Sequence, residues 1–133
     1  MVTVALQTNH IRLQQRLSDL ATIGQLSCGG VRRTAYSLED LAARQMVIAA
    51  MEQVDMDNTI DAAGNIIGRY PGTQDLPALA TGSHIDTVPA GGRYDGALGV
   101  LAGIEVVATL YEADQRLKHP IEVIVFTDEE GEM

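Results

Sequence analysis

A histidine and two aspartates fall within one glycine-rich stretch of the chain. The stretch begins Gly82-Ser83-His84-Ile85-Asp86-Thr87-Val88 and continues to Asp95. A neutral imidazole is the commonest nitrogen ligand of zinc, and carboxylates complete many catalytic zinc sites. Asp86 lies two positions after His84, on the same side if the backbone is extended, so it could accept the hydrogen of the imidazole nitrogen that does not face a metal. This stretch therefore predicts a metal-binding site.

Two adjacent glutamates, Glu129 and Glu130, follow the last apolar segment. Successive side chains of an extended chain point to opposite faces, so one metal ion would not readily take both. We expect one carboxylate to bind metal and the other to move a proton, and the residues alone leave open which does which. Because a metal lowers the pKa of bound water from 15.7 to about 7, a nearby glutamate can take that proton and return it to a leaving nitrogen. This combination suits the hydrolysis of amides.

Each of these features also has an ordinary structural explanation. A lone loop histidine seldom binds metal, the Asp95-Gly96 pair is typical of a turn, and the Glu129-Glu130 pair suits a solvated strand end. Their combination is what favours a metal site. His10 opens a helical segment and His119 precedes a proline, so we expect surface or capping roles for both rather than ligation.

The rest of the chain alternates between helical and extended segments. Apolar residues recur every three or four positions from His10 to Leu26, and a second helix begins at Ser37, which forms a capping-box pattern with Asp40. A third helix is expected over 96–110. Strands are expected over the extended segments 59–61, 65–70, 79–83 and 121–127. Both polar clusters then follow a strand directly, and ligand sites of open α/β sheets gather at the carboxyl ends of strands.

Composition narrows the classes of function. The 133 residues fit one domain, and the formal charge of −9 makes nucleic acids and membranes poor partners. The first nine residues show no secretory signal, so a cytoplasmic location is expected. Cys28 is the sole cysteine, which excludes an internal disulfide and suits a reducing compartment.

Several motifs together resemble one known family. They are the stretch 82–96, Thr127-Asp128-Glu129-Glu130-Gly131, Gly29-Gly30-Val31-Arg32-Arg33 and Asp61-Ala62-Ala63-Gly64-Asn65. The chain resembles the metal-dependent amidase/carbamoylase branch of the aminoacylase-like, M20-type metallopeptidases, which includes N-carbamoyl-L-amino-acid hydrolases, β-ureidopropionases and allantoate amidohydrolases. The resemblance covers nearly the whole chain. It implies an α/β fold with three αβα layers and a mixed sheet.

The resemblance also implies a role for each candidate residue. His84 matches a ligand of one metal, Asp95 the carboxylate that bridges two metals, and Glu130 a ligand of the second. Glu129 matches the general base, and Asp86 matches the partner behind the histidine. The implied cofactors are two divalent metal ions, zinc foremost, with manganese, cobalt or nickel as alternatives. The implied substrate is a small linear amide such as an N-carbamoyl-L-amino acid, allantoate or β-ureidopropionate.

Other parts of the family pattern have no match in this chain. Family members are much longer and carry a further histidine ligand for each metal, a lid or dimerisation domain, and an arginine that grips the substrate carboxylate. We therefore expect residues 1–133 to be the amino-terminal part of a catalytic domain, inactive alone, whose full-length parent is a homodimer. Glu132-Met133 also replaces the arginine-phenylalanine pair of many carbamoylases. Two alternatives stay open: a dipeptidase or aminoacylase of the same fold, and a truncated metal-binding chain without catalysis.

Overall fold

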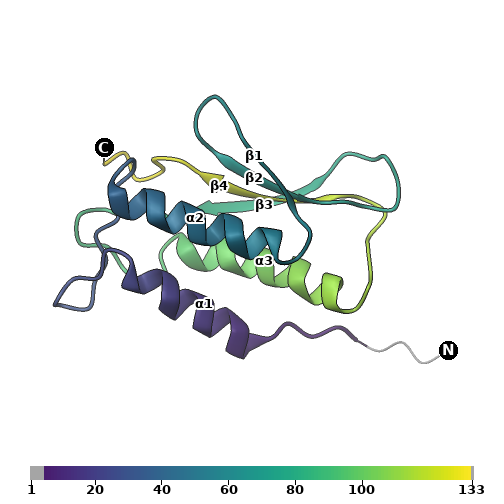
Figure 1. Ribbon diagram of the computed structural model, residues 1–133, viewed down its shortest axis with the longest axis horizontal. Coiled ribbons are helices and arrows are strands. Elements are labelled where there is room, and N and C mark those ends of the chain that lie inside the picture. Colours follow the sequence, from purple (N-terminus) through teal and green to yellow (C-terminus); the bar gives the residue numbers. More distant parts are fainter. Residues whose placement is uncertain (1–4, 133) are drawn as a thin grey trace.

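The computed structural model describes residues 5–132, in which three helices lie on one side of a four-stranded sheet (Figure 1). In chain order the elements are α1 (His10–Thr22), α2 (Leu38–Glu52), β1 (Asp57–Ile60), β2 (Ile66–Tyr70), β3 (Leu79–His84), α3 (Ala97–Glu112) and β4 (Ile121–Phe126). Residues 1–4 and Met133 lie outside the described range. The prediction that the first nine residues contain no secretory signal therefore falls partly on residues that are not described. No helix within that range is long and apolar enough to cross a membrane.

Strand β4 joins the two halves of the sheet. The strand order is β1-β2-β4-β3, and β4 runs antiparallel to β2 and parallel to β3. Helix α3 forms the crossover that parallel neighbours require. Because β3 and β4 run in the same direction, with His84 paired to Phe126, the chain leaves both strands at one edge of the sheet. The two polar clusters of the sequence therefore emerge side by side, as expected.

The apolar core lies between the sheet and the helices. Helix α3 packs on β3 and β4, and α1 packs on α3 on the side away from the sheet (Figure 1). Alternate residues of β2 and β4 face this core and are buried, namely Ile66, Tyr70, Ile121, Val123 and Val125. No helix of residues 5–132 covers the other sheet face, where Phe126 is 44% exposed. The α/β fold and the mixed sheet are confirmed, and the third layer is missing from the described residues.

A side-chain cap sets the start of α2, and a turn sets the end of α1. Ser37 begins α2 as predicted, because its hydroxyl accepts a hydrogen bond from the Asp40 amide at 3.1 Å. The Asp40 carboxylate in turn accepts from the Tyr36 amide at 3.0 Å. Helix α1 ends at Thr22 rather than at Leu26, because the chain turns there and a short bridge pairs residue 25 with residue 31. The apolar periodicity therefore continued past the true end of the helix.

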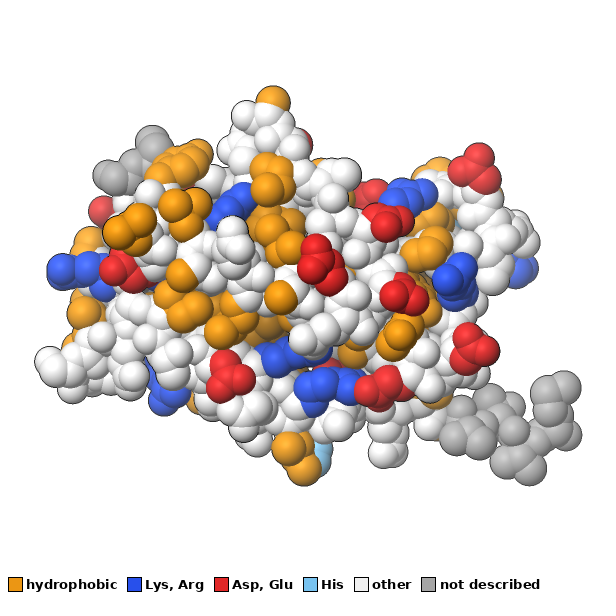
Figure 2. All heavy atoms as spheres, in the orientation of Figure 1, with side chains coloured by type: hydrophobic (Ala, Val, Ile, Leu, Met, Phe, Trp, Pro, Cys, Tyr) orange, Lys and Arg blue, Asp and Glu red, His pale blue; other side chains and the backbone are white. Residues whose placement is uncertain are grey.

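Charges of both signs are mixed on the face drawn in Figure 2. Lysine and arginine side chains there are scattered among aspartates and glutamates, and the described residues in view form no continuous basic surface. Together with the net charge of −9, such a face offers little attraction to a phosphate backbone.

Candidate metal centre

Three side chains predicted as metal ligands converge at the edge where β3 and β4 end. One ligand atom each from His84, Asp95 and Glu130 lies within 4.8 Å of the other two. His84 ends β3, Asp95 lies just before α3, and Glu130 follows β4. Within residues 5–132 this is the only group of three or more such side chains, and neither His10 nor His119 belongs to it.

The hydrogen bond of His84 decides which ring nitrogen can bind a metal. Its Nδ1 lies 2.9 Å from the backbone oxygen of Asp86. A carbonyl oxygen only accepts, so Nδ1 carries the hydrogen and Nε2 keeps the lone pair in the neutral ring. We expected the Asp86 carboxylate to be this partner, but its Oδ1 lies 3.5 Å from Nδ1 and has no hydrogen-bond partner although it is buried. Either contact leaves Nε2 available to a metal.

The two glutamates lie in a turn, not on an extended strand end. Asp128 has a φ of 55°, which bends the chain just before them. The expectation that extended backbone sends the two carboxylates to opposite faces is therefore wrong. The amide of Glu130 donates to Oδ2 of Asp86 at 3.1 Å, which ties the turn to the β3 end. Oε2 of Glu129 lies 3.4 Å from Nε2 of His84, so both carboxyl groups lie near the same imidazole.

The carboxylates of the cluster repel one another. Partial burial raises the pKa of Glu130, and the hydrogen bond to Asp95 and the negative charges of Asp95 and Glu129 raise it further, against a smaller opposing effect of His84. A cation among these oxygens would relieve that repulsion. A mixed set of imidazole and carboxylate donors suits zinc, manganese, cobalt and nickel. The residues present therefore fit a divalent metal ion.

Gly96 leaves the space that the His84 ring occupies. It precedes the first residue of α3, with φ 68° and ψ −50°. A Cβ atom at this position would lie 2.5 Å from Cε1 and Nε2 of His84 and 2.6 Å from its backbone oxygen. Glycine alone accommodates both this backbone conformation and this contact. The sequence indicated a turn at Asp95-Gly96, and the contact with His84 is a finding of the structure.

The hairpin of β1 and β2 anchors the segment that follows β4. The Thr127 amide donates to Oδ1 of Asn65 at 2.9 Å, and Nη1 of Arg44 donates to the Thr127 hydroxyl at 3.1 Å. Asn65 is held in turn by Asp61, whose Oδ2 accepts from its Nδ2 at 3.0 Å. These bonds fix the chain two residues before the first glutamate. Asp61 and Asn65 belong to one of the family-like motifs, to which the sequence assigned no role.

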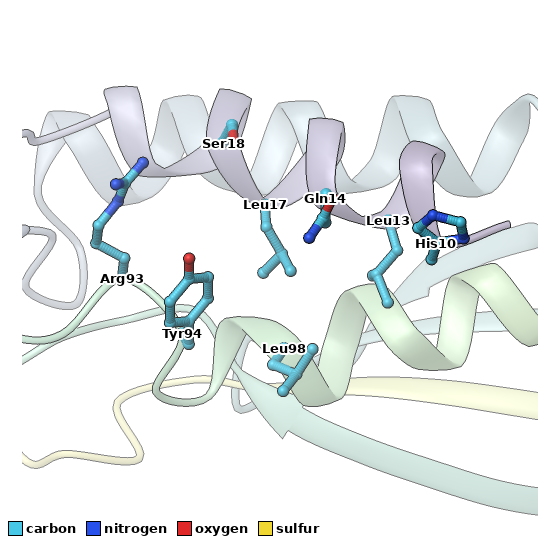
Figure 3. A pocket seen from close by; sticks show the side chains of 8 residues that line it. All are labelled: His10, Leu13, Gln14, Leu17, Ser18, Arg93, Tyr94 and Leu98. Atoms are coloured by element: carbon cyan, nitrogen blue, oxygen red, sulfur yellow. The ribbon is translucent and has the colours of Figure 1, made fainter.

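A pocket of about 560 Å³ lies between α1 and the start of α3. Figure 3 shows its lining side chains, which are His10, Leu13, Gln14, Leu17, Ser18, Arg93, Tyr94 and Leu98. Arg93 and Tyr94 immediately precede Asp95, yet their side chains extend toward α1 (Figure 3). The cluster itself lies outside this pocket, and the Glu129 side chain is 53% exposed. Within the described residues the candidate centre is therefore open to solvent.

Comparisons with known proteins identify the family of the chain. The model of the family described as "Peptidase family M28" matches residues 65–133. The N-carbamoyl-L-amino acid amidohydrolase of Geobacillus stearothermophilus is 47% identical over 121 residues, which cover 90% of this chain and 30% of that protein. The allantoate amidohydrolase of Bacillus subtilis is 40% identical over 113 residues, which cover 84% of this chain and 27% of that protein.

A solved structure is also similar. The crystal structure of a hydantoinase/carbamoylase family amidase from Burkholderia ambifaria matches with a TM-score of 0.94 at 39% identity, over 97% of this chain and 32% of that one. The chain thus spans about 30% of the length of the curated relatives it matches. These relatives confirm the resemblance to the amidase/carbamoylase branch. The family model that matches is M28, whereas the resemblance had named an M20-type class.

Proposed function

The chain belongs to peptidase family M28, and the matched range contains the candidate cluster of His84, Asp95 and Glu130. We propose that it takes part in the metal-dependent hydrolysis of linear amide C–N bonds. One observation carries the proposal: His84, Asp95 and Glu130 converge within 4.8 Å, and Glu129 lies 3.4 Å from Nε2 of His84. A nitrogen donor and two carboxylate donors beside a further carboxylate are the groups that this type of hydrolysis requires.

Each residue of the cluster has its part in the proposed reaction. His84 and Glu130 would each hold one of two divalent ions, with Asp95 shared between them. The bound ions would supply the Lewis-acid chemistry that lets water ionise near neutral pH. Glu129 takes the proton of the attacking water as the water oxygen bonds to the carbonyl carbon. The C–N bond then breaks, and Glu129 returns the proton to the leaving nitrogen.

The proposed substrates are N-carbamoyl-L-amino acids or related linear amides such as allantoate. Relatives of this chain are named for N-carbamoyl-L-amino acids and for allantoate, which supports this class. A second candidate is the hydrolysis of dipeptides or N-acyl amino acids, which the description of the matching family as a peptidase favours. Both candidates use the same cluster and differ in what surrounds the cleaved bond.

Substrate profiling tests the proposal. N-carbamoyl-L-amino acids, allantoate, dipeptides and N-acyl amino acids would be incubated with the chain, and with any longer protein that contains it, in the presence of zinc, manganese, cobalt or nickel. We expect metal-dependent release of amino acid from the N-carbamoyl compounds by the longer protein, and metal binding without turnover by residues 1–133 alone. Preferential cleavage of dipeptides would favour the second candidate. Metal binding without hydrolysis of any compound by the longer protein would favour a non-catalytic metal-binding role, and a folded chain that binds no metal would overturn the proposal.

A further inference from the structure

Arg33 is the largest fully buried side chain of the described residues, with 1% of its surface exposed. No carboxylate of residues 5–132 forms an ion pair with it. Burial lowers the pKa of Arg33, and the more distant charges of Asp40 and Asp86 oppose that effect only in part. A buried guanidinium costs stability unless its hydrogen bonds are satisfied, so the bonds that Arg33 makes indicate what it does.

The guanidinium of Arg33 donates to three backbone carbonyls. Its Nη1 reaches the oxygens of Leu20 and Ile23, at 3.0 and 2.9 Å, where α1 ends. Its Nε donates to the oxygen of Ile85 at 2.7 Å. Ile85 lies between the histidine of the metal centre and the aspartate that holds its ring. One side chain therefore joins the end of α1 to the segment that leaves β3.

The main chain around Arg33 holds the same segment. The Arg33 amide donates to the hydroxyl of Thr87 at 2.8 Å, and the Thr87 amide donates to the Arg33 oxygen at 2.9 Å. The Thr87 hydroxyl also donates to the Val31 oxygen at 3.2 Å. Residues 31–33 thus hold residues 85–87 through both backbone and side-chain bonds, all of them next to the His84–Asp86 contact.

We propose that Arg33 is a positioning residue of the metal centre, because it fixes the backbone of residues 85–87 and keeps Nδ1 of His84 bonded to the Asp86 carbonyl. Nε2 then stays available to a metal. The metal-binding part of this inference rests on the proposed function. The competing explanation is that Arg33 only terminates α1, through the carbonyls of Leu20 and Ile23.

Two variants of the intact chain separate these explanations. Arg33→Met keeps a long side chain and removes every side-chain donor. Glu105→Gln weakens the buried ion pair between Arg12 and Glu105, 2.7 Å apart, which joins α1 to α3 without touching residues 85–87. Both variants loosen α1, and the folded fraction of each would be checked by circular dichroism. In a Co²⁺ titration we expect Arg33→Met to weaken binding about 10- to 100-fold, as changes behind metal-binding histidines do, and Glu105→Gln to leave it unchanged.

A second measurement does not depend on metal. The ring ¹H–¹⁵N signals of His84 in the metal-free protein should shift in Arg33→Met and stay in place in Glu105→Gln. Unshifted signals together with unchanged Co²⁺ affinity in Arg33→Met would overturn the proposal, and so would equal effects of the two variants. If Arg33→Met does not fold, Arg33→Lys replaces it, since one ammonium group cannot donate from the Nε and Nη1 positions at once, and the same two measurements decide between the explanations. A native chain that binds no Co²⁺ would contradict the proposed function. The ring signals of His84 alone would then decide whether Arg33 positions the imidazole.

Discussion

Replacement of Gly96 by alanine would test whether the metal centre depends on the close approach of α3 to His84. The added carbon would lie 2.5 Å from Cε1 and Nε2 of the ring and 2.6 Å from the backbone oxygen of the same residue. The ring can rotate away, but the oxygen belongs to β3 and moves only with the strand. The φ of 68° adds a backbone cost of about 1–3 kcal/mol for a residue other than glycine.

Two quantities should change in Gly96→Ala. At roughly 4 °C per kcal/mol, the backbone strain should lower the melting temperature by about 4–12 °C. Displacement of the His84 ring removes a proposed direct ligand, so the loss of Co²⁺ affinity should exceed the effect of changes behind a ligand and reach at least about 100-fold, or about 2.8 kcal/mol. Calorimetric titration measures the affinity, and circular dichroism measures the melting temperature.

Two other glycines provide matched controls. Gly29 has a φ of 88°, but a Cβ atom there would meet nothing within 4 Å, so Gly29→Ala introduces the strain without the clash. Gly92 has neither a positive φ nor a near neighbour. We expect Gly29→Ala to lower the melting temperature and retain Co²⁺ affinity, and Gly92→Ala to change neither. If Gly96→Ala binds Co²⁺ as tightly as Gly29→Ala, the steric argument is refuted.

Three further predictions concern the proton carrier, the histidines and acid stability. In a longer, active protein that contains this chain, Glu129→Gln should lower kcat toward an N-carbamoyl-L-amino acid about 10²- to 10⁴-fold with unchanged metal content, and retained turnover would exclude its role as base. His84→Ala should abolish Co²⁺ binding in a titration where His119→Ala, which lies outside the cluster, binds normally; equal binding by both would exclude His84 as a ligand. Burial opposes ionisation of Glu105, but hydrogen bonds from Arg12 and the Asn9 amide, with nearby positive charge, outweigh it and lower the pKa of Glu105. A lowered carboxyl pKa contributes stability above the unfolded pKa that is lost as the pH falls through the folded value, so thermal unfolding of the native chain should show an acid loss that Glu105→Gln reduces.

The sequence by itself determined the kinds of element and the chemistry available to them. Ser37 specified the start of α2 because its hydroxyl caps the first turn, and the β-branched run 121–127 specified β4. The candidate donor groups, His84 and the Glu129-Glu130 pair, were also predictable, since the donor atoms of a side chain do not depend on the fold. The assignment of Glu130 rather than Glu129 as the ligand came from the family resemblance. The end of α1 could not be predicted, because the apolar periodicity continues to Leu26 although the helix ends at Thr22.

Only the tertiary structure decided how these residues meet. The parallel pairing of β3 with β4 brings the Glu130 amide to the carboxylate of Asp86, 44 positions away in the chain. The turn at Asp128 directs both glutamates toward the same imidazole, and the buried bonds of Arg33 hold the backbone beside it. None of these contacts follows from local propensity, because strand register and the approach of distant segments are set by which faces the whole chain buries in one core.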